Sequence, residues 1–360
     1  MDVAEICRAA VRQGASDIHL KVGQPPMLRV HGAMAPMAGS PRISKEAMGK
    51  AAWAMMTPMQ RERFKVDNDL DLAWQLSGVG RFRVNVFRQR QAIGMVLRTI
   101  PTEVKTIDEL RLPPVLKDVA RFPRGLVLVT GTTGSGKSTT LAALIEEVNR
   151  NLPHHVLTIE DPVEFTFADR RSIINQREIG VDSLSFATAL RAALRQDPDV
   201  ILVGELRDRE TVEIALQAAE TGHLVLSTLH TLDAPEAINR ILGFFEPHHQ
   251  QHIRYGLSSV LRAVLSQRLV PTKTGGRVAA IEIMLNTGTI AECISDAARI
   301  KEIPDHIAKG HKVYQTQTFD QSVYKLLMDG VITEEAALRS VNNPDELSLR
   351  LRGIGTDDWG

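Results

Sequence analysis

The sequence predicts an α/β protein of two domains, in which a larger domain with a mostly parallel sheet follows a smaller α+β domain. In the larger part, short apolar runs alternate with helical patterns, which is the order that right-handed βαβ units produce. In the smaller part, polar and apolar residues alternate along the strand-like runs, as in an antiparallel sheet with one face in solvent. A length of 360 residues is also more typical of two domains than of one.

The smaller domain is expected to span residues 1–100. Its runs at 18–22 and 81–87 show the period-two alternation of half-exposed strands, and short helical segments lie between such runs. The pattern breaks over residues 101–114, where prolines bracket a polar stretch. Because proline interrupts regular structure, this stretch is predicted to be the interdomain linker.

The larger domain is expected to occupy residues 115–360. Asp208 and Asp233 are predicted helix N-caps, and Gly222 stands just past a predicted helix end. Beyond about residue 287 the chain is predicted to be helical. A ligand is expected at the carboxyl ends of the parallel strands. The apolar runs predicted to be those strands are 126–130, 156–159, 200–203 and 224–227.

One loop of the larger domain carries a phosphate-binding pattern. Residues 131–138 read G-T-T-G-S-G-K-S, which fits G-x-x-x-x-G-K-[ST], and they stand between a predicted strand and a helical run. In such a loop backbone N–H groups and a helix N-terminus face phosphate oxygens, lysine reaches the terminal phosphates, and the serine hydroxyl meets Mg²⁺. We expect a nucleoside triphosphate here, held by Thr133, Gly134, Ser135, Gly136, Lys137, Ser138 and Thr139.

The apolar run 200–203 is followed by Gly204 and Glu205. At this strand end a nucleotide hydrolase usually carries an aspartate for Mg²⁺, and glycine cannot bind the metal. Phosphoryl transfer depends on positioning the attacking water, so Glu205 is predicted to orient and polarise that water. The alternative is a glutamate on the surface at a strand end.

Three acids follow the run 156–159, and they are expected to supply the oxygen ligands that Mg²⁺ needs in place of Gly204. Glu160 and Glu164 are the predicted residues, whereas Asp161 precedes a proline and is expected to shape the turn. The alternative for each of them is a solvated acidic turn.

Histidines and arginines complete the candidate site. His230 follows the strand 224–227 at its carboxyl end, where it is predicted to donate a hydrogen bond to the terminal phosphate; the alternative is a structural histidine. Arg83 and Arg98 of the smaller domain are candidates for bidentate phosphate contact, supplied from outside the phosphate-binding domain. By pattern alone, a solvated strand face is the better interpretation of these arginines.

Composition narrows the class of protein. Lysine plus arginine equal aspartate plus glutamate, 43 against 43, so no net charge favours nucleic acid or anionic lipid. Cys7 and Cys293 lie far apart, and neither a disulfide nor a zinc site is predicted. No apolar run approaches the roughly 20 residues of a membrane span, and the start lacks the basic residues of a signal peptide. We expect a cytoplasmic protein whose membrane attachment comes through a partner.

Taken together, these segments resemble the secretion-superfamily ATPases, and within them the pilus-retraction ATPases. The resemblance runs over nearly the whole chain. Its motifs are G-A-S-D-I-H-L at 14–20, R-F-R-V-N at 81–85, the phosphate loop, the Asp box at 158–164, the atypical Walker B at 197–205, the His box ending at His230 and G-R-V-A-A at 276–280.

The resemblance implies a PAS-like first domain, a RecA-like ATPase domain and a homo-hexameric ring with ATP and Mg²⁺ between its parts. It makes Glu205 the catalytic glutamate, puts Glu160 and Glu164 beside Mg²⁺, and assigns Arg83 and Arg98 to phosphate contact across a cleft. ATP-driven rotation of the domains would power pilus retraction and twitching motility through an inner-membrane platform protein of the PilC type, with a second retraction ATPase as a further partner.

The sequence is also compatible with other functions. Extension ATPases of the superfamily carry a four-cysteine zinc insertion that a chain with two cysteines lacks, so retraction is the expected direction. An accessory retraction ATPase shares much of the same pattern. From other classes, the alternatives are a RecA-like nucleic-acid translocase, which balanced charge disfavours, and a nucleotide-regulated assembly protein.

Overall fold

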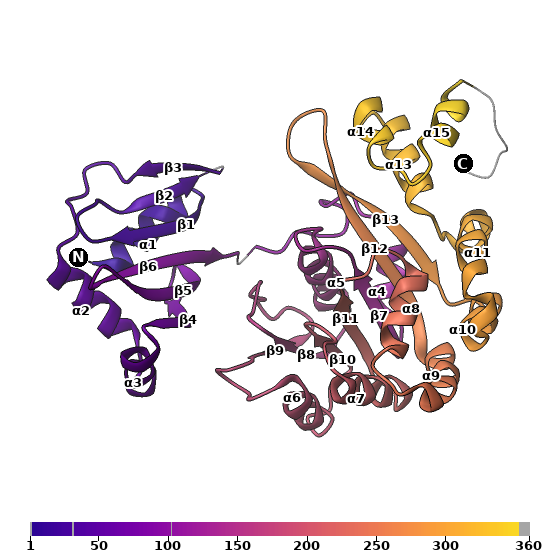
Figure 1. The fold of residues 1–360 in the computed structure, drawn as a ribbon, viewed down its shortest axis with the longest axis horizontal. Coiled ribbons are helices and arrows are strands. Elements are labelled where there is room, and N and C mark those ends of the chain that lie inside the picture. Colours follow the sequence, from indigo (N-terminus) through magenta and orange to yellow (C-terminus); the bar gives the residue numbers. More distant parts are fainter. Residues whose placement is uncertain (1, 31, 102, 353–360) are drawn as a thin grey trace. The chain divides into compact units, whose positions relative to one another are not determined.

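The computed structural model describes residues 2–30, 32–101 and 103–352. The chain divides into two compact units (Figure 1). The first unit contains Met1–Glu103 together with Glu164–Thr166, and the second contains Val104–Val163 and Phe167–Gly360.

The first unit is built on a six-stranded sheet in the order β3-β2-β1-β6-β5-β4, in which every neighbouring pair is antiparallel. Side chains alternate between buried and more exposed along β5, as the sequence pattern predicts, and the buried face includes Phe82 and Val84. The helices pack on this face through residues such as Met48 and Phe64. The elements are α1 (Val3–Arg12), β1 (Ala15–Lys21), β2 (Met27–Val30), β3 (Ala33–Pro36), α2 (Lys45–Met55), α3 (Pro58–Asp67), β4 (Asp69–Leu76), β5 (Gly80–Gln89) and β6 (Ala92–Ile100).

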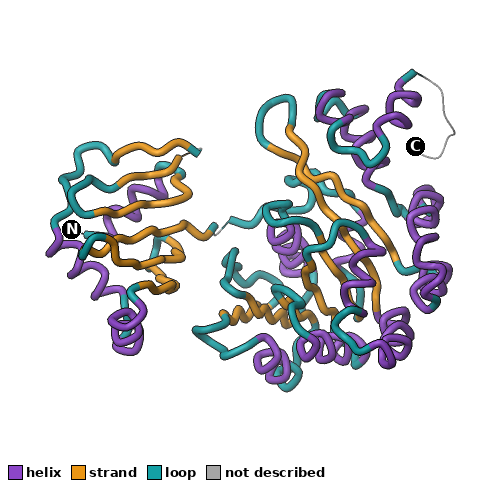
Figure 2. The backbone as a smooth tube through the Cα atoms, viewed as in Figure 1, coloured by secondary structure: helices purple, strands orange, loops and turns teal. Residues whose placement is uncertain are grey.

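The second unit is built on a seven-stranded sheet in the order β13-β12-β7-β11-β10-β8-β9. All neighbouring pairs are parallel except β12 with β13, which confirms the predicted α/β class with a mostly parallel sheet. Figure 2 shows the strands of this sheet with helices around them. The strands are β7 (Gly125–Thr130), β8 (His155–Glu160), β9 (Ile173–Glu178), β10 (Val200–Val203), β11 (Leu224–Leu229), β12 (Leu261–Pro271) and β13 (Arg277–Leu285).

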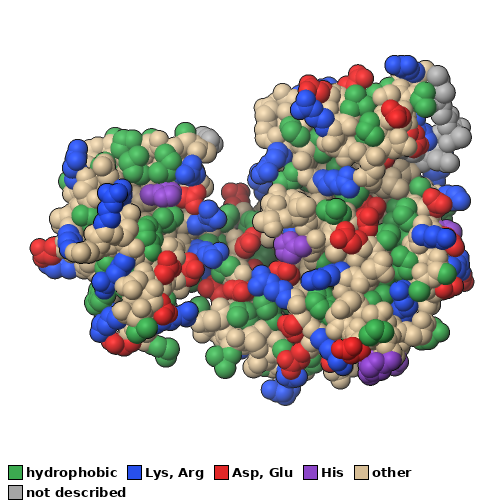
Figure 3. Space-filling view, in the orientation of Figure 1, with side chains coloured by type: hydrophobic (Ala, Val, Ile, Leu, Met, Phe, Trp, Pro, Cys, Tyr) green, Lys and Arg blue, Asp and Glu red, His purple; other side chains and the backbone are tan. Residues whose placement is uncertain are grey.

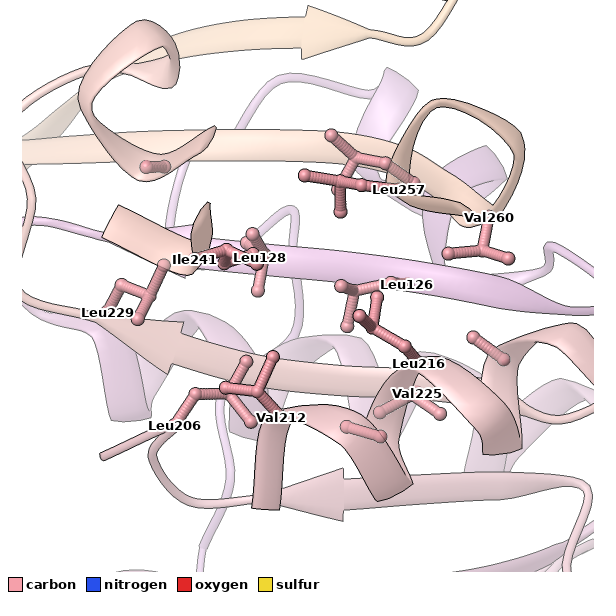
Figure 4. Packing of buried hydrophobic residues seen from close by; sticks show 14 of the residues in the cluster. Leu126, Leu128, Leu206, Val212, Leu216, Val225, Leu229, Ile241, Leu257 and Val260 are labelled. Atoms are coloured by element: carbon pink, nitrogen blue, oxygen red, sulfur yellow. The ribbon is translucent and has the colours of Figure 1, made fainter. Parts of the chain in front are cut away.

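The central strands of this sheet are buried on both faces because each face carries a hydrophobic cluster. On one face of the sheet, strands β7 and β11 pack against two helices, α7 and α8 (Figure 4). The side chains in this layer include Leu126, Leu128 and Val225 from the strands and Val212 and Ile241 from the helices. The helices are α4 (Val115–Ala120), α5 (Lys137–Asn151), α6 (Phe186–Ala193), α7 (Arg209–Glu220), α8 (Ala234–Leu242), α9 (Pro247–Val260), α10 (Gly288–Ser295), the 3₁₀ helix η1 (Ala297–Glu302), α11 (Ile303–Lys309), α12 (His311–Tyr314), α13 (Phe319–Met328), α14 (Glu334–Leu338) and α15 (Pro344–Leu351).

Local signals in the sequence explain where several of these helices begin. The Asp208 side chain accepts a hydrogen bond from the N–H of Thr211 at the start of α7, and Asp233 accepts one from Glu236 at the start of α8. Gly222 follows the end of α7 with a φ of +115°, a conformation that suits glycine. The helices α10 to α15 follow β13, as the pattern beyond residue 287 predicts.

The prediction that residues 101–114 form an interdomain linker is wrong for most of these residues. Of residues 101–114, those from Val104 onward belong to the second unit, where Ile107 and Leu112 are buried in the hydrophobic cluster on one face of the sheet. The prolines suggested an exposed connection, but the apolar side chains between them cover the core. The second unit therefore begins at Val104 rather than at Val115.

Basic and acidic side chains are interspersed on the face drawn in Figure 3, as the balanced charge of the sequence suggests. None of the described helices combines the length and the apolar character that a bilayer span requires.

Candidate active site

The loop between β7 and α5 has the geometry of a phosphate-binding loop. Gly131, Gly134 and Gly136 all have positive φ, at +140°, +79° and +93°. A Cβ on Gly131 would lie 2.5 Å from the carbonyl oxygen of Gln267, so no side chain fits at that position. Gly136 is the N-cap of α5 and provides no side-chain cap, which leaves the first N–H groups of the helix to bind an anion.

Lys137 lies inside this loop and is 9% exposed. Its Nζ donates hydrogen bonds to the carbonyl oxygens of Gly131, at 2.7 Å, and Thr132, at 3.1 Å. The same Nζ is 3.5 Å from Nδ1 of His230 at the end of the neighbouring strand β11. The structure thus brings together the lysine and the histidine that the sequence placed at two separate strand ends.

Glu205 lies on the other side of the His230 ring from Lys137 and extends this series of polar contacts. Its Oε1 is 3.3 Å from Nε2 of His230, and its Oε2 accepts a hydrogen bond from Nε of Arg207 at 2.8 Å. Arg207 in turn is 3.6 Å from the carboxylate of Asp161. The strands β7, β11, β10 and β8 are neighbours in that order, so their carboxyl ends lie along one edge of the sheet. His223, by contrast, lies at the other end of β11, where its ring contacts the carbonyl oxygen of Ala218.

Gly204 has a steric reason to be glycine. A Cβ at this position would lie 3.2 Å from the carbonyl oxygen of Ile159 and 3.4 Å from Cα of Glu160, since β10 and β8 approach each other closely there. An aspartate would require the backbone of β8 to move. Glu160, one of the predicted metal ligands, is 9% exposed and accepts a hydrogen bond from Thr158 at 2.6 Å. Mg²⁺ prefers carboxylate and hydroxyl oxygens, so Glu160 and Ser138, which lies in the first turn of α5, have the donor chemistry expected for this metal, and their place beside it stays a prediction.

The remaining predicted residues belong to the first unit. Glu164 lies in the segment Glu164–Thr166, which groups with the first unit, and its place beside Mg²⁺ stays a prediction. Arg83 and Arg98 face each other across β5 and β6. Arg98 donates to Asp17 at 2.8 Å, whereas Arg83 is 3.9 Å from Asp71. Burial would raise the pKa of Asp17, but the hydrogen bonds from Arg98 and Ser16 hold it below its usual value.

A cavity of about 280 Å³ adjoins Glu205 and His230. It lies where β10 and β11 end and α8 begins. The Thr231 side chain is 3% exposed, and its hydroxyl has no hydrogen-bond partner among the described residues. The lining residues are Glu205, Leu206, Arg207, Leu229, His230, Thr231, Glu236 and Arg240.

Sequence reasoning missed Gln267, which anchors the phosphate loop from β12. Its amide donates to the carbonyl oxygen of Ser135 at 2.8 Å and accepts from the Thr140 hydroxyl at 2.7 Å, and the residue is 3% exposed. The one signal in the sequence is a polar residue inside an apolar run, which by itself does not indicate a partner.

Gln267→Leu is expected to weaken nucleotide binding about tenfold. The change leaves two buried polar groups without partners, at a cost of about 1–3 kcal/mol each, and it frees the loop from β12. Titration of a fluorescent ADP analogue measures the effect. Gln217→Leu on the exposed face of α7 is the matched control. Equal affinities for the two variants would contradict the role given to Gln267.

Glu282 of β13 supports the helix that follows His230. Its carboxylate accepts hydrogen bonds from the N–H of Ala234, at 2.9 Å, and from Ser266, at 3.2 Å. Burial raises the pKa of Glu282 to about 7. A raised pKa means that the folded protein holds this proton more tightly than the unfolded chain, so stability is lost as pH rises from 4.5 toward 7.

Glu282→Gln is expected to remove this pH dependence, because the amide stays neutral. Between pH 5 and pH 8, the free energy of unfolding of the wild type should fall relative to the variant by up to about 3 kcal/mol. Urea unfolding at both pH values measures the difference. Glu335→Gln, which alters an exposed glutamate, should behave as the wild type does. Parallel pH profiles for wild type and Glu282→Gln would contradict the assignment.

The phosphate loop follows β7 of a mostly parallel sheet, and the acidic residue Glu205 follows β10, two strands away. This arrangement defines the class of P-loop nucleotide-binding proteins. Within this class, the chain belongs to the type II/IV secretion system protein family, whose model matches residues 1–339. The matched residues include parts of both units of the structure.

Individual relatives are similar over almost their whole length. The type IV pilus retraction ATPase PilT of Pseudomonas aeruginosa is 43% identical over 351 residues, covering 96% of this chain and 99% of that protein. The type IV pilus ATPase PilU of the same organism is 41% identical over 353 residues, covering 98% and 92%. A crystal structure of the pilus retraction motor PilT with bound ADP matches with a TM-score of 0.87 and 43% identity, covering 97% of this chain and 99% of that chain.

Proposed function

We propose that the protein is a cytoplasmic, ATP-hydrolysing motor that powers type IV pilus retraction and thereby twitching motility. The observation that carries the proposal is the series of contacts in which His230 lies between Lys137 and Glu205. The chain that contains it is 43% identical to a pilus retraction ATPase. A phosphate-binding lysine, a hydrogen-bond donor and a carboxylate that can position water are suited to cleavage of a terminal phosphate.

Each of these residues has a defined task in the proposed reaction. The N-terminus of α5 and the loop N–H groups hold the phosphates, and Lys137 neutralises charge on the terminal one. Glu205 orients the attacking water and accepts a hydrogen bond from it. His230, whose ring nitrogens lie 3.5 Å from Lys137 and 3.3 Å from Glu205, donates to the terminal phosphate when that phosphate is present. Bound Mg²⁺, held by Ser138 and Glu160, would neutralise charge on the phosphate oxygens.

The proposal extends to residues that act from the first unit. We assign Arg83 and Arg98 to phosphate contact and Glu164 to the surroundings of Mg²⁺, in a homo-hexameric ring in which nucleotide turnover rotates the units of each chain. Planar guanidinium groups suit bidentate phosphate contact, and an arginine supplied from elsewhere couples hydrolysis to the arrangement of the parts. The ring would act on an inner-membrane platform protein of the PilC type, which would hold it at the inner membrane.

An accessory retraction ATPase is the second candidate, and the 41% identity to PilU favours it almost as much as the 43% identity to PilT favours the first. A strain with the gene deleted separates the two. A primary motor is expected to leave surface pili that do not shorten at all, whereas loss of an accessory motor would leave retraction with reduced force.

Rescue of the deletion strain tests the function itself. The wild-type gene should restore shortening of fluorescently labelled pili, and a gene that carries Glu205→Gln should not, although the protein accumulates to the same level. Normal retraction in the deletion strain would overturn the proposal. ATPase activity stimulated by single-stranded DNA, with a steep salt dependence, would instead support a nucleic-acid translocase.

A further inference from the structure

The helical segments that follow β13 bring together three side chains that the sequence keeps apart. Cys293 lies on α10, Glu302 ends η1, and His306 lies on α11. One donor atom from each, namely the thiol sulfur, a carboxylate oxygen and an imidazole nitrogen, lies within 4.8 Å of the other two. We propose that these three side chains form a binding site for a divalent transition-metal ion, with zinc as the best match.

The chemistry of the donors favours this class of ion. A thiolate, an imidazole and a carboxylate are the ligand types that zinc takes in proteins, while the hard ions Mg²⁺ and Ca²⁺ prefer oxygen alone. Three protein ligands leave one tetrahedral position for water. In such a site neighbouring donor atoms are about 3.5 Å apart. The 3.9 Å between Glu302 and His306 is already close to that separation.

The surroundings hold the donors in place. Cys293 is fully buried in the same hydrophobic cluster as Ile303 and Ile307, so its sulfur has little freedom to move. Glu302 and His306 are four residues apart, which places them on one face across the junction of η1 and α11. An ion held by all three would connect α10, η1 and α11 through a single centre.

Charges near the site set the conditions for binding. Arg299 is 3.1 Å from both Glu302 and Glu292, so it can release Glu302 to an ion and still keep an ionic partner. The thiolate is the form of cysteine that binds a metal ion, so the Cys293 thiol would give its proton to solvent as the sulfur–metal bond forms. Affinity is expected to increase as pH rises, because protons compete with the ion.

Titration with Co²⁺ tests the site, because a cobalt–thiolate bond has a charge-transfer absorption in the near ultraviolet that oxygen and nitrogen ligands do not give. Full-length protein, stripped with a chelator and kept free of nucleotide and Mg²⁺, is expected to develop this band at one Co²⁺ per chain and to lose it when Zn²⁺ is added. Cys293→Ser should abolish the band. His306→Gln and Glu302→Gln, which leave the core intact, should each weaken Co²⁺ binding at least about tenfold.

Cys7→Ser is the matched control, because Cys7 is the one other cysteine of the sequence and burial raises its pKa to about 12. This variant should keep the band at full strength. The proposal is overturned if the wild type shows no band, if the band survives Cys293→Ser, or if the His306 and Glu302 variants bind Co²⁺ as tightly as the wild type. None of these results depends on ATP hydrolysis.

Discussion

Lys137→Ala is expected to abolish ATP turnover and to weaken nucleotide binding at least about a hundredfold. The ammonium group lies within the loop, bonded to two carbonyl oxygens and next to His230, so its removal deletes the positive charge that faces the phosphates. A hydrogen bond from a charged group is worth about 1.5–3 kcal/mol, and an ammonium group has three N–H donors to offer phosphate oxygens. Equilibrium binding of a fluorescent ATP analogue and steady-state phosphate release measure the two losses.

Lys117→Ala is the control for Lys137→Ala. Lys117 lies on α4, where its ammonium group pairs with Asp108 at the surface. Its loss should change neither affinity nor turnover, and both variants should retain the circular dichroism of the wild type. Turnover by Lys137→Ala at more than a tenth of the wild-type rate would show that the loop is not the phosphate site.

Glu205→Gln is expected to lower ATP turnover by about 10³-fold while affinity for ATP changes little. The amide keeps the shape of the side chain and one oxygen that can accept from Arg207, but it cannot accept the proton of the attacking water. General-base catalysis contributes about 10²–10⁴-fold to a rate. Single-turnover cleavage of ATP followed by rapid quench separates this loss from any change in binding.

Glu213→Gln serves as the control for Glu205→Gln. Glu213 lies on α7 and pairs with Arg209 on the exposed face of that helix, away from the strand ends. Its rate should equal that of the wild type. If Glu205→Gln cleaved ATP as fast as Glu213→Gln does, the base would have to be a different residue, and Glu160 would be the next to test.

The four strands predicted for the larger domain agree with β7, β8, β10 and β11 to within two residues at each end. Their sequences are continuous apolar runs, and every residue of β7, β10 and β11 is buried. For strands buried on both faces, composition alone is a sufficient signal. The meeting of Lys137, His230 and Glu205 was predictable for the same reason, because parallel strands end at a common edge.

The strands β9, β12 and β13 were not predicted. β12 contains Arg262, Gln267 and Arg268 among its apolar residues, and β9 reads I-I-N-Q-R-E, so neither shows a continuous run or a clean alternation. Gln267 was missed with its strand: it bonds to Ser135, a residue 132 positions away in the sequence. The cluster of Cys293 with His306 was missed because no spacing pattern connects residues on separate helices.

The roles of Arg83, Arg98 and Glu164 stay predictions, and for the two arginines the family resemblance is the stronger argument. Local sequence indicates a charged strand face for the two arginines, and the structure shows ion pairs with acidic neighbours in the first unit. In the proposed ring, a contact with phosphate would arise only when nucleotide and neighbouring chains are in place. Such a contact would be a property of the proposed assembly, which no pattern within one unit encodes.

The most direct test of the central claim is a crystal structure of the protein with Mg²⁺ and a non-hydrolysable ATP analogue. The account predicts a terminal phosphate hydrogen-bonded to Lys137 and His230, with a water between that phosphate and the Glu205 carboxylate. An analogue bound away from the loop at 131–138, or a Glu205 side chain that turns away from the terminal phosphate while no water joins them, would contradict it.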